Sequence, residues 1–185
     1  MGAGAVNADT PIDPPLGFAF DTNALFQYRV LEDVCKLALA AGSYRLMVPV
    51  ICHGERLRQL MVQHGSRYGP HQVAAYIEQN GLEVVDLSAD HAEAFAELAS
   101  SRYPSEGEWR AATTAACDWH APEPEAEEPA SPPHAPTTAD WFVAAAAAAE
   151  GLVLVSDDQG EELSICTRWT LSKTLGYLRG RASTT

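Results

Sequence analysis

The stretch Gly17-Phe18-Ala19-Phe20-Asp21-Thr22-Asn23-Ala24-Leu25 decides the fold of this chain. A short apolar run ends in an acid, which is followed by two small polar residues and the start of a helical pattern. We interpret the run as a buried strand that carries Asp21 at its carboxyl end. Open α/β sheets bind their ligands at that edge. The sequence therefore predicts an α/β fold with a functional site beside Asp21.

Length and composition indicate one domain with an insertion. A chain of 185 residues that is 46% hydrophobic can bury a substantial core. Residues 1–15 are rich in Gly, Ala, Asp and Pro and are interpreted as a flexible leader, which leaves residues 16–185 as the domain. An acidic, Pro-rich insertion is expected at about residues 104–136, because its composition cannot support a packed core.

The charge and the cysteines restrict the class of protein. The net charge is −13, and it is still −7 without residues 105–138, so a general nucleic-acid binder with a basic face is disfavoured. No stretch has the length and apolarity of a membrane span, and no secretory signal is visible. The four cysteines lack zinc-ligand spacing and are interpreted as reduced thiols of a cytoplasmic protein.

The remaining elements follow from periodicity and from Gly and Pro. Helices are expected at residues 25–42, 52–62, 72–79, 91–101 and 137–150, and further strands at residues 44–51, 82–87 and 152–155. Pro49 indicates that its strand is short, lies at an edge or finishes there. Asp90 and Glu93 are expected to form a capping pair at the start of the helix at 91–101.

Acids recur where these elements meet. Asp21 and the pair Asp157-Asp158 follow strands, whereas Glu55 and Asp140 open helices. Each acid also has a structural explanation: Glu55 would complement a helix dipole, Asp140 would cap a helix, and the Asp pair would form a polar turn. In a parallel sheet with right-handed crossovers, however, all these positions meet at one edge.

A cluster of this kind has a predictable chemistry. Two carboxylates ~5 Å apart repel by about 3 kcal/mol at an effective dielectric constant near 20, so the cluster would raise its own pKa values or bind a cation. An all-oxygen set favours Mg²⁺ or Mn²⁺ over zinc and suits phosphoryl chemistry. No Walker loop, GxSxG or GxGxxG sequence indicates a competing chemistry.

Four segments carry a family resemblance: Phe20-Asp21-Thr22-Asn23, Val48-Pro49-Val50 leading to Glu55, Asp140-Trp141-Phe142 opening an alanine-rich helix, and Ser156-Asp157-Asp158. In this order they resemble the PIN-domain ribonucleases, especially the VapC-type toxins of toxin–antitoxin pairs. The resemblance covers roughly residues 17–162 apart from the insertion. It implies a three-layer α/β/α sandwich with a mostly parallel sheet, RNA cleavage dependent on Mg²⁺ or Mn²⁺, a homodimer and an antitoxin partner.

The same resemblance assigns roles to residues. Asp21, Glu55, Asp140 and Asp158 would hold the metal, and Asn23 and Ser156 would orient these acids by hydrogen bonds. The family has Thr-x-Asp where this chain has Ser156-Asp157-Asp158, a register that favours Asp158, although adjacent Asp157 is an alternative ligand.

The sequence also offers basic residues that could contact RNA phosphates, and it leaves two alternative functions open. Arg56, Arg58 and the basic tail at residues 165–181 are the candidate phosphate contacts, and the acidic insertion before Asp140 is placed to tune RNA access. One alternative is a non-catalytic PIN-fold binding module. A less favoured one is a phosphohydrolase of the haloacid-dehalogenase type, which needs a second acid where Asn23 stands.

Overall fold

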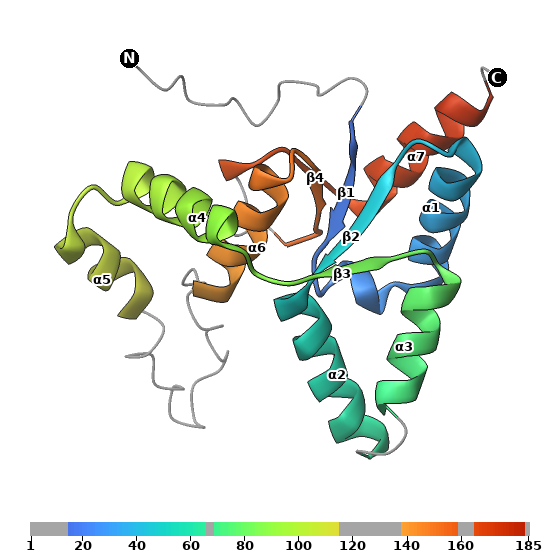
Figure 1. Ribbon diagram of the computed structural model, residues 1–185, viewed down its shortest axis with the longest axis horizontal. Coiled ribbons are helices and arrows are strands. Elements are labelled where there is room, and N and C mark those ends of the chain that lie inside the picture. The colour runs from blue at the N-terminus through green and yellow to red at the C-terminus, as the bar shows by residue number, and fades with distance from the viewer. Residues whose placement is uncertain (1–14, 66–68, 115–137, 159–164, 184–185) are drawn as a thin grey trace, which may run out of the picture.

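The computed structural model describes residues 15–65, 69–114, 138–158 and 165–183. Within these ranges the chain forms a five-stranded sheet in the order β3-β2-β1-β4-β5, and every strand pairing is parallel. The strands are Gly17–Phe20 (β1), Arg45–Pro49 (β2), Glu83–Val85 (β3), Val153–Val155 (β4) and Arg168–Trp169 (β5). The expected α/β class with a parallel central sheet is therefore confirmed (Figure 1).

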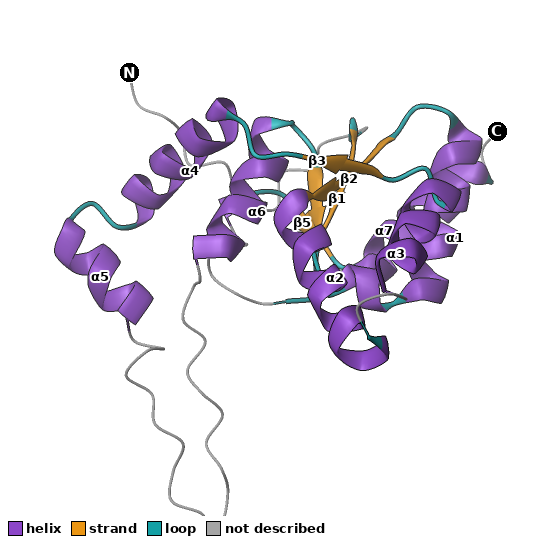
Figure 2. Ribbon diagram, turned by 60° about the horizontal axis from the view of Figure 1, so that its bottom comes forward, coloured by secondary structure: helices purple, strands orange, loops and turns teal. Residues whose placement is uncertain are grey.

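Helices cover both faces of the sheet and complete three layers. They are η1 (Ala24–Phe26), α1 (Tyr28–Ala41), α2 (Val50–His64), α3 (Gly69–Gln79), α4 (Ala89–Arg102), α5 (Glu106–Thr114), α6 (Thr138–Ala149) and α7 (Leu171–Ala182). Figure 2 shows the sheet between the pair α1 and α7 on one side and the pair α4 and α6 on the other. The helices α2 and α3 pack on each other beyond the carboxyl ends of β1 and β2 (Figure 1).

The central strand β1 is buried along its whole length, as its apolar run predicts. Phe18 and Phe20 are fully buried between the helical layers. Gly17 is required at the start of the strand, because a Cβ atom there would lie 2.1 Å from the carbonyl oxygen of Arg45 on β2. This close approach fixes β1 against β2 and sets where Asp21 emerges.

Two turns explain how helices meet the sheet. Gly42 ends α1 in the left-handed conformation with φ 70°, as the sequence predicts. Pro49 finishes β2, an internal strand, and precedes the first residue of α2. Of the three interpretations of Pro49, the structure therefore selects a strand that finishes there.

The start of α4 corrects one expectation. The cap is Ser88, whose hydroxyl accepts a hydrogen bond from the His91 amide at 3.2 Å, while His91 Nδ1 faces the Ser88 amide at 3.2 Å. The predicted pair Asp90 and Glu93 is therefore wrong, because the helix begins at Ala89 and Asp90 already lies in its first turn. The reciprocal pattern is that of a capping box with histidine in the position usually held by Glu or Gln.

The C-terminal region adds a strand and a helix that the sequence did not predict. β5 pairs with β4, and α7 packs on α1 through buried residues that include Leu178. Two cations of the basic tail make contacts at the surface: Lys173 lies over the Trp169 ring, and Arg179 lies 3.7 Å from Asp33.

The predicted leader and the predicted insertion lie largely outside the described residues. Residues 1–14 of the predicted leader lie outside them. Of the predicted insertion, residues 106–114 form α5 and residues 115–136 lie outside the described ranges. Across the described part of the chain, no helix combines the length and apolarity needed to cross a bilayer.

Candidate active site

Asp21 occupies the carboxyl end of the central strand. Its backbone amide donates to the carbonyl oxygen of Val155 at 3.1 Å, which ties the ends of β1 and β4 together. The residue is 9% exposed. The strand thus places a carboxylate at the edge where parallel α/β sheets bind ligands, in a largely desolvated position.

Neutral donors surround the Asp21 carboxylate. The Thr22 amide donates to Oδ1 at 2.6 Å, and Asn23 Nδ2 and the Ser156 hydroxyl reach Oδ2 at 3.1 and 2.8 Å. Asn23 Nδ2 also lies 2.9 Å from the Ser156 hydroxyl, and Cys52 Sγ lies 3.7 Å from Oδ1. Asn23 and Ser156 therefore both hydrogen bond to Oδ2 of Asp21.

The electrostatic balance at Asp21 favours the protonated form relative to an exposed aspartate. Burial raises the pKa of Asp21, hydrogen bonds from Ser156 and Thr22 partly lower it, and the charge of Asp140 raises it further. Asp140 lies in the first turn of α6 and acts on Asp21 at the same sheet edge. A cation at this position would oppose both causes of the raised pKa.

Glu55 reaches the same edge through a threonine. The Thr22 hydroxyl donates to Glu55 Oε2 at 2.5 Å. Because α2 begins at Val50, Glu55 lies beyond the first turn, so the explanation based on the helix dipole is wrong. Burial and the charge of Asp21 raise the pKa of Cys52, and Glu55 adds a smaller effect in the same direction.

Asp157 and Asp158 take different positions after β4. Asp157 Oδ1 accepts from the Leu171 amide at 3.2 Å, and its Oδ2 accepts from Gln27, so its carboxylate joins the start of α7 to the turn before α1. The Asp158 amide donates to the Ser156 hydroxyl at 3.1 Å. Asp158 is thus linked through its backbone to the Ser156–Asp21 pair, while Asp157 has a structural role.

The two arginines on α2 differ in exposure. Arg58 is exposed, whereas Arg56 is 5% exposed and its guanidinium lies over the rings of Phe26 and Tyr28. Burial lowers the pKa of Arg56. The structure therefore leaves Arg58 available to an external phosphate and places Arg56 inside the α2–α3 pair.

The acids near this edge of the sheet offer carboxylate oxygens, which is the type of ligand that Mg²⁺ takes in proteins. In the described ranges no three His, Cys, Asp or Glu side chains are grouped closely enough to hold a metal ion by themselves. Mg²⁺ commonly keeps several waters and binds through one or two carboxylates, and Asp21 and Asp140, whose charge acts on Asp21, are carboxylates of that type.

Sequence reasoning missed Thr22, Gln27 and Cys52. Thr22 bridges Asp21 and Glu55, Gln27 holds Asp157, and Cys52 faces Asp21. Thr22 and Gln27 lie close to Asp21 in sequence, but no pattern of residue types indicates their contacts with distant segments.

Comparison with solved structures shows a likeness of fold. The crystal structure of VapBC2 from Rickettsia felis bound to a DNA fragment from their promoter contains a chain that is 15% identical, with a TM-score of 0.54. The match covers 83% of this chain and 97% of that chain. No family model and no curated protein sequence matches the chain. The fold is thus similar to that of a VapBC2 component.

Proposed function

We propose that this protein is a metal-dependent endoribonuclease that hydrolyses RNA phosphodiester bonds. The observation that carries the proposal is the buried Asp21 carboxylate, oriented by Asn23 and Ser156 and coupled in charge to Asp140 at the carboxyl edge of the sheet. The likeness to the VapBC2 chain and the PIN-type order of the acids support the same class.

Asp21 and Asp140, with Glu55 and Asp158, would hold Mg²⁺ or Mn²⁺. When bound, the ion would supply positive charge to polarise the scissile phosphate and to lower the pKa of an attacking water. The protein's own contribution is preorganisation. Asn23 and Ser156 fix Asp21, Thr22 fixes Glu55, and burial keeps bulk water from Asp21. Arg58 is the proposed contact for an RNA phosphate.

We also propose a cytoplasmic protein that acts as the toxin of a toxin–antitoxin pair, forms a homodimer and binds an antitoxin protein. The support is the VapC-type resemblance together with the fold shared with a chain of the VapBC2 structure. Co-expression with the product of a small adjacent reading frame, followed by co-purification, tests the partnership.

A non-catalytic binding module is the second candidate. One observation favours it: the described side chains do not form a group of three potential metal ligands. A module of this kind would bind its partner in the presence of Mg²⁺ or Mn²⁺ and would not cleave RNA.

Cleavage of RNA by the purified protein distinguishes the two candidates. With Mg²⁺ or Mn²⁺ the wild-type protein should cleave, and Asp21→Asn should slow cleavage by more than about 100-fold, because even residues that only orient a metal ligand contribute 10–100-fold. Asp90→Asn, on the exposed first turn of α4, is the matched control and should cleave normally. Equal cleavage by Asp21→Asn and wild type would contradict the nuclease assignment.

A further inference from the structure

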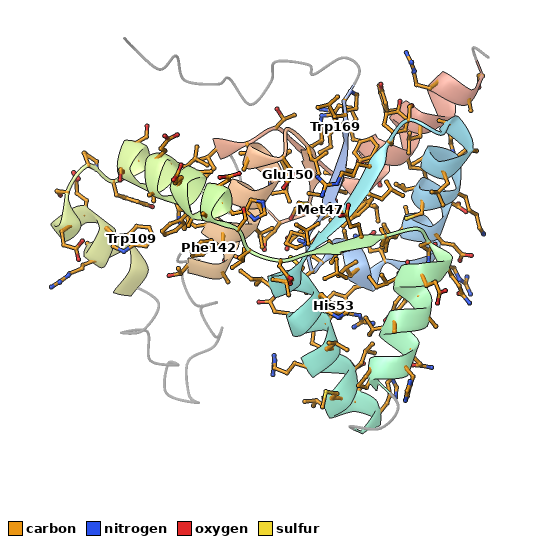
Figure 3. All side chains as sticks on the ribbon, viewed as in Figure 1. Met47, His53, Trp109, Phe142, Glu150 and Trp169 are labelled. Carbon is orange, nitrogen blue, oxygen red and sulfur yellow. The ribbon has the colours of Figure 1, made fainter. Side chains whose placement is uncertain are left out.

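The pair of helices α2 and α3 encloses a cavity that the proposed nuclease site does not use. Its volume is ≈ 260 Å³, and its walls include Tyr28, His53, Arg56, Leu60, Val73 and Tyr76. Figure 3 shows His53 on α2 beside the space between α2 and α3. Most of the lining is apolar, and one charged side chain, Arg56, is buried in it.

Arg56 lacks an ionic partner among the described residues. Its guanidinium carbon lies 4.5 Å from the centre of the Phe26 ring and 4.9 Å from that of Tyr28. Its Nη1 lies 3.5 Å from Gln59 Oε1, and its buried Nε has no hydrogen-bond partner within the described ranges. None of the described carboxylates forms an ion pair with it.

These contacts leave the charge of Arg56 poorly compensated. The desolvation penalty of a buried ion is larger than the stabilisation that cation–π contacts provide, and a neutral hydrogen bond at 3.5 Å adds little. Buried charges in proteins are normally paired. A lone buried guanidinium that lines a cavity is therefore suited to a ligand that brings the missing negative charge.

A second unsatisfied atom lies in the same wall. The Nδ1 atom of His53 is buried, and no residue in the described part of the chain hydrogen bonds to it. Arg56 and His53 thus both leave a ring or guanidine nitrogen unused beside the cavity, and the apolar side chains of Leu60 and Val73 lie next to them. The arrangement combines a polar corner with apolar walls, which is the usual composition of a small-molecule site.

We propose that this cavity binds a small organic anion, namely a carboxylate carried on a compact apolar or aromatic body. The fork of Arg56 is the recognition element for the carboxylate, and the apolar walls hold the body. A free phosphate would leave those walls without a partner, and the 5% exposure of Arg56 excludes contact with the backbone of a bound RNA polymer from outside. The site is independent of the proposed nuclease activity.

Calorimetric titration of the full chain with benzoate tests the proposal. Benzoate should bind saturably to the wild type and to Arg58→Met, which removes an exposed arginine from the same helix. Binding to Arg56→Met should be at least about tenfold weaker, which is the expected loss of one charge-assisted contact. Benzamide, which has the same body without the charge, should show the same weakening on the wild type.

Two further measurements keep the test independent of misfolding. Removal of an unpaired buried charge is expected to leave the Tm of Arg56→Met, measured without ligand, unchanged or higher. Val73→Phe fills the cavity and should abolish benzoate binding while Arg56 remains. The proposal is overturned by any of these results: no saturable binding of benzoate to the wild type, unchanged binding to Arg56→Met or Val73→Phe, equal binding of benzamide, or a lower Tm of Arg56→Met.

Discussion

At the amino edge of the sheet, Arg45 of β2 forms ion pairs with Glu83 and Glu150, and His91 of α4 lies 3.1 Å from Glu150. At the carboxyl edge, Asp21 is held by an amide of Thr22, the side-chain amide of Asn23 and the hydroxyl of Ser156, all neutral groups. Carboxylates at the amino edge thus have Arg45 as an ionic partner, whereas the carboxylate of Asp21 is hydrogen bonded to neutral groups. Figure 3 marks Glu150 at the end of α6 near the amino edge.

The two environments shift the pKa values of Glu150 and Asp21 in opposite directions. Hydrogen bonds from Arg45 and His91 lower the pKa of Glu150, whereas burial raises the pKa of Asp21. The charged form of Glu150 therefore stabilises the fold, whereas the charged form of Asp21 opposes folding. A buried acid that costs stability and is nevertheless oriented by three donors is typical of a site kept for chemistry.

Ser156→Ala should produce the larger change, at the carboxyl edge. The substitution removes a donor to Asp21 at 2.8 Å and an acceptor for the Asp158 amide at 3.1 Å. We expect metal-dependent RNA cleavage to slow by about 10–100-fold, the usual effect of losing a group that orients a metal ligand. The initial rate of cleavage with Mn²⁺ measures it. Ser172→Ala, an exposed site on α7, is the control, and a Ser156→Ala rate equal to that of this control would contradict the role.

Glu150→Gln should weaken the amino edge and spare the chemistry. The amide keeps the shape but loses the charge that pairs with Arg45 and His91, so we expect the free energy of unfolding to fall by about 1–2 kcal/mol. Urea denaturation measures the loss. Glu83→Gln, which removes a more exposed partner of Arg45, should cost no more than about 0.5 kcal/mol. A slower cleavage rate in Glu150→Gln would contradict the claim that the amino edge contributes to stability and not to catalysis.

The pH dependence of stability should have opposite signs at the two edges. The pKa of Asp21 is raised on folding, so its contribution to stability falls as the pH rises from its usual value near 3.8 through its folded pKa. The pKa of Glu150 is lowered, so its contribution is complete above its usual value of 4.5 and is lost as the pH falls through its folded pKa.

Urea denaturation at a series of pH values, with a chelator present, checks both signs. Relative to the wild type, Asp21→Asn should become more stable as the pH rises towards 7, and Glu150→Gln should become less stable. If the stability of both variants relative to the wild type changed in the same direction with pH, the predicted difference between Glu150 and Asp21 would be contradicted.

The sequence was sufficient for most of the fold because its signals were local. The apolar run before Asp21, the glycines at 42 and 151, and Pro49 each mark an element boundary that the structure has. The strand β5 was missed because it is only two residues long, and α7 was missed because Gly176 and Gly180 interrupt a polar sequence. The cap at Ser88 was missed because histidine rarely takes the third position of a capping box.

The candidate site was predictable only in part. Positions at strand ends follow from topology, so Asp21 and Ser156 could be brought together before any coordinates. Contacts such as Thr22 with Glu55, or Gln27 with Asp157, depend on rotamers and on the exact approach of α2 and of the turn after β4. The burial of Arg56 was missed because its place in the helix gives no sign that α3 and two aromatic rings cover it.

Binding of Mn²⁺ to the wild type and to Asp21→Asn tests the central claim most directly, because the claim is that Asp21 is an acid placed to receive a cation. Calorimetric titration at neutral pH should show saturable binding to the wild type and to the control Asp90→Asn. Binding to Asp21→Asn should be at least about 100-fold weaker. Equal affinity of Mn²⁺ for the wild type and for Asp21→Asn would contradict the account.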